Sequence, residues 1–198
     1  MTTNGFFLHP AALAPNEQAD LVTDVLARIS AAPFYHAATP GGGRMSVAMT
    51  NLGPLGWVSD VSGYRYQSMH PITEASWPAL PPILERLWRR YTGRSDSPDA
   101  CLVNRYDAAA RMGLHQDKDE KDLSAPVLSI SLGDTAIFRI GGQVRRDPTG
   151  SVRLASGDIC VLSGDARLAF HGIDRIIPGS SRLIPGGGRI NLTLRRAR

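Results

Sequence analysis

The chain has 198 residues, of which 42% are hydrophobic and 20% are charged, and its formal net charge is +4. This length suits one compact domain with a sizeable core, and the composition is that of an ordinary soluble protein rather than a disordered or membrane-spanning one. No apolar run reaches the roughly 20 residues that a transmembrane helix needs. The basic excess would favour a polyanionic partner but does not by itself establish one.

The first residues of the chain and its two cysteines indicate the compartment to expect. The first residues lack the basic segment and the long apolar segment of a signal peptide, so we expect a cytoplasmic protein. Cys101 and Cys160 each lie in an apolar, strand-like run. In a reducing compartment, buried free thiols are favoured over a disulfide.

Two amphipathic helices are predicted in the first half of the chain. Over residues 16–29, apolar side chains recur at helical spacing, with Asn16 as the expected N-cap after Pro15. The second helix is predicted from Pro81 or Pro82 to about Tyr91, because its apolar residues form one stripe. The segment between the helices is rich in Gly, Pro and aromatic residues, which is compatible with short hairpins.

After Asp99 the sequence changes to short strand-like runs separated by turns. Runs at this spacing are typical of a sandwich or a barrel. The predicted strands are residues 101–106, 127–132, 136–140, 152–154, 158–162, 167–171 and 189–194. We therefore divide the chain into residues 1–98, with the helices, and residues 99–198, with the sheets, within one compact unit.

A candidate metal site consists of His115, Asp117 and His171. Residues i and i+2 of a strand point the same way, so His115 and Asp117 can face one ion, and His171, at the end of a predicted strand, could complete the site. Two histidines and one carboxylate are typical of non-haem iron(II) oxygenases, which keep positions open for an oxidant and a co-substrate. Taken alone, a His-x-Asp pair more often marks a surface loop or a capped turn.

The last predicted strand gives a more specific signal. Its apolar residues alternate with polar residues that share the other face. These polar residues are Arg189, Asn191, Thr193 and Arg195. A sheet with a solvated face has the same pattern, but two arginines at fixed spacing could also hold the two ends of a dicarboxylate. Together with the metal residues, this pattern favours an iron enzyme that uses 2-oxoglutarate.

Several runs of the sequence resemble the AlkB family of nucleic-acid demethylases. In the second half they are Asn104-Arg105-Tyr106, His115-Gln116-Asp117, Phe170-His171-Gly172 and the closing R-x-N-x-T-x-R pattern of residues 189–195. Upstream, Leu55-Gly56-Trp57 and Gly63-Tyr64-Arg65-Tyr66 are similar to the base-recognition lid of bacterial members. The resemblance extends from about residue 45 to the C-terminus.

The resemblance implies an α+β, mainly β fold: a double-stranded β-helix, or jelly roll, with N-terminal helices and a nucleotide-recognition lid. The implied iron(II) ligands are His115, Asp117 and His171. The implied 2-oxoglutarate contacts are Asn104, Tyr106, Arg189, Asn191 and Arg195, with Arg189 at the distal carboxylate. Members of this family consume O2 and convert 2-oxoglutarate to succinate and carbon dioxide.

The resemblance also implies a substrate and its contacts. Typical substrates are N1-methyladenine and N3-methylcytosine, whose hydroxylated methyl group leaves as formaldehyde and restores the base. The implied contacts are Trp57, Tyr64, Tyr66, Asp119 and Arg145. A carboxylate suits a cationic base, and an aromatic plate suits an extruded one. Without the resemblance, the charged run at residues 118–122 would be interpreted as a solvated loop and Trp57 as a core residue.

We therefore expect a monomeric, direct-reversal DNA repair enzyme that needs iron(II), 2-oxoglutarate and O2. Its expected partner is single-stranded DNA, with duplex DNA or RNA also compatible, and no membrane. Two alternatives remain open. One is an iron and 2-oxoglutarate dioxygenase that acts on a protein or a small molecule, and the other is a nucleic-acid-binding module that lacks catalysis. The intact set of predicted metal ligands and arginines argues against the second alternative.

Overall fold

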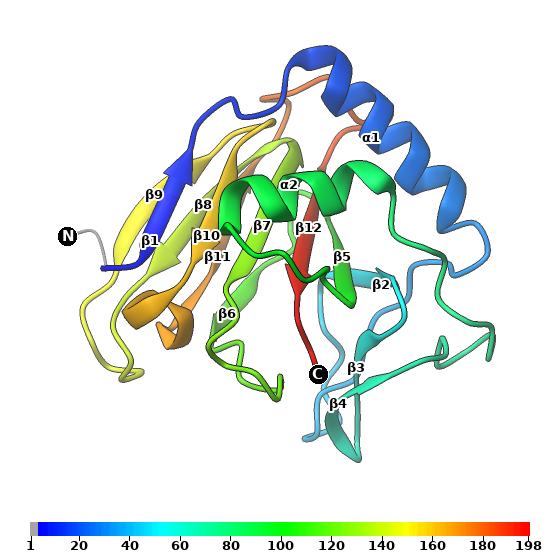
Figure 1. The fold of residues 1–198 in the computed structure, drawn as a ribbon, viewed down its shortest axis with the longest axis horizontal. Coiled ribbons are helices and arrows are strands. Elements are labelled where there is room, and N and C mark those ends of the chain that lie inside the picture. Colours follow the sequence, from blue (N-terminus) through cyan, green and yellow to red (C-terminus); the bar gives the residue numbers. More distant parts are fainter. Residues whose placement is uncertain (1–3) are drawn as a thin grey trace.

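Two antiparallel sheets form the body of the protein, as the computed structural model of residues 4–198 shows (Figure 1). The six strands of the larger sheet are, in spatial order, β1 (Phe6–His9), β10 (Ile159–Leu162), β7 (Val127–Gly133), β12 (Arg189–Arg195), β5 (Ala100–Tyr106) and β2 (Ala48–Leu52). The four strands of the smaller sheet are β6 (Met112–His115), β11 (His171–Ile177), β8 (Thr135–Ile140) and β9 (Gly150–Leu154). This arrangement confirms the predicted double-stranded β-helix.

A separate hairpin, formed by β3 (Gly56–Asp60) and β4 (Gly63–Gln67), lies next to β2 and β5 at one edge of the larger sheet (Figure 1). We call residues 56–67 the lid hairpin. Its tight turn contains Gly63, whose φ of +114° is a conformation that few other residues adopt. The hairpin agrees with the short hairpins that the Gly- and aromatic-rich segment predicts.

Helices α1 (Pro15–Arg28) and α2 (Pro82–Thr92) cover the outer face of the larger sheet (Figure 1). Leu21 and Val25 of α1 and Trp88 of α2 share one core cluster with the apolar side of the sheet. Both predicted helices are therefore confirmed, but the expected cap of the first is wrong. The N-cap is Ala14, whose N–H donates to the Glu17 carboxylate at 2.8 Å, because the helix already begins at Pro15. None of the described helices is long and apolar enough to cross a membrane.

Apolar and polar residues alternate along β12, and this alternation places the polar side chains in the candidate site. Ile190, Leu192 and Leu194 belong to the core under the helices, whereas the polar residues between them face the space between the two sheets. Cross-strand pairing adds polar neighbours, because Asn191 lies opposite Asn104 on one side and Ser131 on the other. The predicted division of faces is confirmed, and both cysteines are free and buried, as expected.

The prediction of a strand at residues 167–171 is wrong. Residues Gly164–Leu168 form a 3-10 helix (η1), and β11 begins at His171, so this histidine opens a strand instead of ending one. Buried Arg167 causes the difference, since its Nε donates to the carbonyl oxygen of Ala125 at 2.7 Å and fixes the turn to a distant loop. The sequence patterns also miss the four-residue strands β1 and β6, which are edge strands of their sheets.

Candidate active site

The three predicted metal ligands converge between the strand ends of the smaller sheet. His115 of β6 and His171 of β11 are direct cross-strand partners, and their ring centroids are 4.5 Å apart. Asp117 faces both rings, with Oδ1 3.8 Å from Nε2 of His115 and Oδ2 3.8 Å from Nε2 of His171. One potential ligand atom from each residue lies within 4.8 Å of the others, which brings the predicted triad together.

Hydrogen bonds leave the correct atoms of this triad available for a metal. Nδ1 of His115 donates to the carbonyl oxygen of Gly113, and Nδ1 of His171 donates to that of Ala169, both at 2.9 Å. Each ring therefore keeps its Nε2 lone pair free for coordination. Within the described part of the chain, the buried Oδ2 of Asp117 has no hydrogen-bond partner, an arrangement that a cation would satisfy. Iron(II) fits this donor set.

The electrostatic surroundings favour the metal-binding protonation states. Burial alone would raise the pKa of Asp117, but Arg195 and the two histidines outweigh it and hold the pKa well below its usual range. Burial, reinforced by His115, lowers the pKa of His171 to about 4. Near neutral pH, Asp117 is therefore ionised and His171 is neutral, as metal ligands must be.

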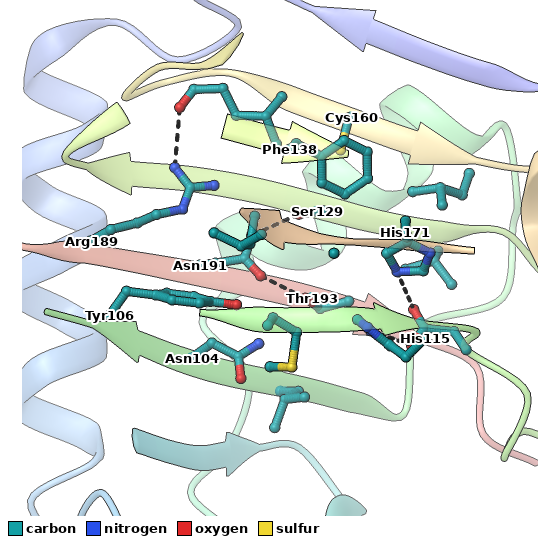
Figure 2. Close-up of a pocket in the computed structure, with 18 of the residues that line it drawn as sticks. Asn104, Tyr106, His115, Ser129, Phe138, Cys160, His171, Arg189, Asn191 and Thr193 are labelled. Carbon is teal, nitrogen blue, oxygen red and sulfur yellow. Dashed lines mark hydrogen bonds and ion pairs between the residues drawn. The ribbon is translucent and has the colours of Figure 1, made fainter. Parts of the chain in front are cut away.

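A small cavity, lined by both polar and apolar side chains, extends from the metal residues into the space between the sheets (Figure 2). Arg189 lies at the end opposite His115 and His171, and its side chain is among the most buried in the protein. Its guanidinium donates to Ser131 Oγ at 2.8 Å and to the carbonyl oxygen of Leu154 at 3.2 Å. Among the described residues, no carboxylate forms an ion pair with it. Because a buried charge with only neutral partners is costly, Arg189 favours an anionic ligand.

The remaining predicted co-substrate residues line the same cavity. Burial raises the pKa of Tyr106 to about 12, so its hydroxyl stays neutral. The buried Oδ1 of Asn104 has no hydrogen-bond partner among the residues that the structure describes. Asn191 is held within the protein, since it donates to Ser129 Oγ at 2.6 Å and accepts a hydrogen bond from Thr193 at 2.8 Å. The structure thus brings together every residue predicted to contact 2-oxoglutarate.

Arg195 lines this cavity at the metal end but is already engaged. Its Nη2 donates to Oδ1 of Asp117 at 2.7 Å, and its Nε lies 3.4 Å from Oε1 of Glu120. The two arginines of the last strand are therefore not equivalent. Among residues 4–198, Arg189 forms no ion pair with a carboxylate, whereas Arg195 balances the charge of a predicted metal ligand.

A second and wider cavity has a volume of about 330 Å³. It shares His115 and Asp117 with the first cavity. Trp57 and Tyr64 of the lid hairpin form one wall, with ring centroids 5.5 Å apart and planes at 17°. Nε1 of Trp57 donates to Oδ2 of Asp119 at 2.7 Å. Arg145, also at this cavity, donates to the carbonyl oxygen of Leu114 at 2.8 Å and lies 5.7 Å from the ring centre of Phe170. These four predicted substrate residues are brought together.

Tyr66, the fifth residue predicted to contact the substrate, lies outside the lining of this cavity. It shares the face of the lid hairpin that carries Trp57, but its hydroxyl donates to Oε1 of Glu120 at 2.5 Å. Glu120 in turn is not part of a solvated loop, because only 2% of its side chain is exposed. The signal in the sequence was indirect, since the buried arginines Arg167 and Arg195 require a nearby carboxylate.

Comparisons with known proteins agree with this geometry. Residues 5–195 match the 2OG-Fe(II) oxygenase superfamily. Over 194 residues the chain is 61% identical to the alpha-ketoglutarate-dependent dioxygenase AlkB homolog of Caulobacter vibrioides (strain NA1000 / CB15N). The matched region covers 98% of this chain and 88% of that protein. The chain belongs to the AlkB family of iron(II) and 2-oxoglutarate dioxygenases. It is also 45% identical over 186 residues to AlkB of Escherichia coli (strain K12), with coverages of 92% and 86%.

The fold is shared with a solved member of the same family. The structure of OsALKBH1 has a TM-score of 0.82 and 32% sequence identity, and the match covers 98% of this chain and 99% of that one. The AlkB-family chain is therefore a dioxygenase that uses iron(II), 2-oxoglutarate and O2. When bound, the metal and co-substrate supply the oxidising chemistry. The protein supplies the ligand set, the cavity and the exclusion of side reactions.

Proposed function

We propose that this dioxygenase removes methyl groups from alkylated bases of nucleic acid, with N1-methyladenine and N3-methylcytosine in single-stranded DNA as its substrates. In this proposal the metal ligands are His115, Asp117 and His171, and Arg189 binds the distal carboxylate of 2-oxoglutarate. Two further relatives support nucleic acid as the substrate class. They are named DNA N(6)-methyladenine demethylase, from Arabidopsis thaliana, and tRNA demethylase, from Schizosaccharomyces pombe, and they match 50% and 40% of this chain.

The observation that carries the proposal is the wall of the wider cavity. Enzymes that act on a base take it out of its stack and hold it between aromatic or apolar side chains. Trp57 and Tyr64 offer such a surface, and the same cavity reaches His115 and Asp117. A base stacked on the wall would present its methyl group to the metal site.

The charge of the same wall favours a cationic base. Asp119 uses one carboxylate oxygen to accept from Trp57 and is otherwise exposed, so a second oxygen is available beside the stacking surface. N1-methyladenine and N3-methylcytosine carry a positive charge that an adjacent carboxylate stabilises. Arg145 at the rim is suited to the phosphate backbone, whose contacts fix the register of the strand.

The proposal is tested with a single-stranded oligonucleotide that contains one N3-methylcytosine. With iron(II), ascorbate and 2-oxoglutarate, we expect mass spectrometry to show loss of the methyl group in step with succinate formation, and no loss when 2-oxoglutarate is left out. If an added protein or small molecule stimulates the conversion of 2-oxoglutarate to succinate while the methyl group of the oligonucleotide is untouched, the enzyme belongs to the other class of dioxygenase. Binding of the oligonucleotide with neither product would leave only a binding role.

Replacement of Trp57 by alanine should weaken use of the oligonucleotide. Stacking on an aromatic side chain contributes roughly 1–3 kcal/mol per base, so kcat/KM should fall by about 5- to 150-fold. Binding of Mn(II) and 2-oxoglutarate should be weakened much less than use of the oligonucleotide. Phe7→Ala, which removes an exposed ring from β1 outside the cavity, is the matched control. Equal turnover by Trp57→Ala and the wild type would contradict the stacking role.

A further inference from the structure

A buried cluster of charged side chains lies between the metal residues and the lid hairpin. Its members are Asp117, Glu120, Arg167 and Arg195, whose side chains are between 2% and 7% exposed. Two carboxylates and two guanidinium groups balance in charge, so the cluster satisfies itself inside the protein. Such groups are expensive to bury, and loss of one member leaves its partner uncompensated. The cluster is therefore sensitive to the position of each residue.

Glu120 is the member that contacts all sides of the cluster. Its Oε2 accepts from Nη2 of Arg167 at 3.0 Å. Its Oε1 lies 3.4 Å from Nε of Arg195 and accepts from the hydroxyl of Tyr66 at 2.5 Å. A single carboxylate thus joins two buried arginines to a residue of the lid hairpin.

Both arginines also donate hydrogen bonds to the proposed metal ligand Asp117. Arg195 donates to its side-chain Oδ1 at 2.7 Å, and Arg167 donates to its main-chain carbonyl oxygen. The other side-chain oxygen, Oδ2, has no hydrogen-bond partner among residues 4–198 and is the one that faces His171. The arginines therefore fix both the backbone and the rotation of the carboxylate.

The lid hairpin is attached to the same loop at two neighbouring residues. Trp57 and Tyr66 are cross-strand partners within the hairpin. The first donates to Asp119 and the second to Glu120. Burial raises the pKa of Tyr66 above its ordinary value, so its hydroxyl remains a hydrogen-bond donor. The aromatic wall of the wider cavity is thus tied to the loop that carries Asp117.

From these contacts we infer that Tyr66 and Glu120 are positioning residues that couple closure of the lid hairpin to the orientation of Asp117. The inference rests on the proposed function for the role of the lid, but the coupling itself involves no nucleic acid. A metal that fixes Asp117 also fixes Arg195, which holds Glu120 where Tyr66 reaches it. Coupling between two sites is reciprocal, so closure of the lid must raise metal affinity by the same factor.

Hydrogen exchange with and without Mn(II) plus 2-oxoglutarate tests the coupling in Tyr66→Phe. In the wild type we expect the two ligands to slow exchange of residues 56–67 by about tenfold, since the hydrogen bond at stake involves a charged group. In Tyr66→Phe this ligand-dependent difference should disappear, and Mn(II) affinity should fall severalfold. Arg65→Gln is the matched control, because the neighbouring Arg65 pairs with exposed Asp60 at 2.8 Å and should leave both readouts unchanged.

A second variant separates coupling from simple anchoring of the hairpin. Glu120→Gln keeps an oxygen for Tyr66 but removes the charge that faces the arginines, so it should weaken Mn(II) binding more than Tyr66→Phe does. If Tyr66→Phe speeds exchange equally in the presence and absence of ligands, and binds Mn(II) like the wild type, Tyr66 only anchors the lid and the inference is overturned. Because no oligonucleotide is present, failure of the demethylation assay would not produce this result.

Discussion

Asp117→Asn should abolish turnover of 2-oxoglutarate, with succinate formation reduced by at least about 10³-fold, or about 4 kcal/mol of lost transition-state stabilisation. The amide replaces a charged ligand oxygen by a neutral group that also carries N–H donors. It thereby removes the anion that faces both histidines and pairs with Arg195 at 2.7 Å. Succinate formation and Mn(II) binding by calorimetry measure the two losses separately.

The same substitution should also destabilise the metal-free protein. Breaking a buried ion pair on one side costs about 3–5 kcal/mol, and we expect the lower end because Glu120 remains near Arg195. Urea unfolding measures this change in the free energy of unfolding. Asp174→Asn is the control, since Asp174 pairs with Arg175 at an exposed site and should cost less than about 1 kcal/mol. Unchanged Mn(II) affinity in Asp117→Asn would refute the assignment of this residue as a ligand.

Periodicity predicts the elements with long, regular patterns. The two helices and the β12 strand are found where the spacing of apolar residues places them, because burial of one face fixes both conformation and orientation. The short strands β1 and β6 have no fully buried residue, so they lack the apolar run that marks the equally short β10. The turn η1 depends on Arg167, whose partners lie more than 40 residues away in the chain, and no local pattern encodes such contacts.

In the site, too, the sequence predicts the features that depend on neighbouring residues and misses those that depend on contacts between distant residues. The i, i+2 spacing of His115 and Asp117 and the alternation of β12 are local, so they predict which side chains share a cavity. The unequal roles of the two arginines are not local. Arg189 and Arg195 occupy equivalent positions in the pattern, but only the folded chain brings Asp117 and Glu120 to Arg195. The hydrogen bond of Tyr66 to Glu120 is not predictable for the same reason, because the two residues are distant in sequence.

Arg189→Met should weaken binding of 2-oxoglutarate strongly while it changes the free energy of unfolding of the metal-free protein only slightly. Loss of the guanidinium removes charge-assisted hydrogen bonds to the distal carboxylate, so the Kd for 2-oxoglutarate should rise by about 100-fold, or about 2.7 kcal/mol. The metal-free protein should unfold within about 2 kcal/mol of the wild type. Removal of a buried charge that has no carboxylate partner offsets the lost hydrogen bonds to Ser131 and Leu154.

Thermal unfolding with Mn(II) measures both effects of Arg189→Met in one experiment. At 2-oxoglutarate concentrations near 100 times the wild-type Kd, the wild type should gain about 2.7 kcal/mol, whereas the variant should gain about 0.4 kcal/mol. Arg153→Met, which removes an exposed arginine from β9, should respond like the wild type. A variant that is strongly destabilised without ligand but stabilised normally by 2-oxoglutarate would show that Arg189 supports the fold and that another residue holds the distal carboxylate. Since Arg189 is buried among neutral partners, we expect the opposite: a nearly unchanged fold that no longer responds to its co-substrate.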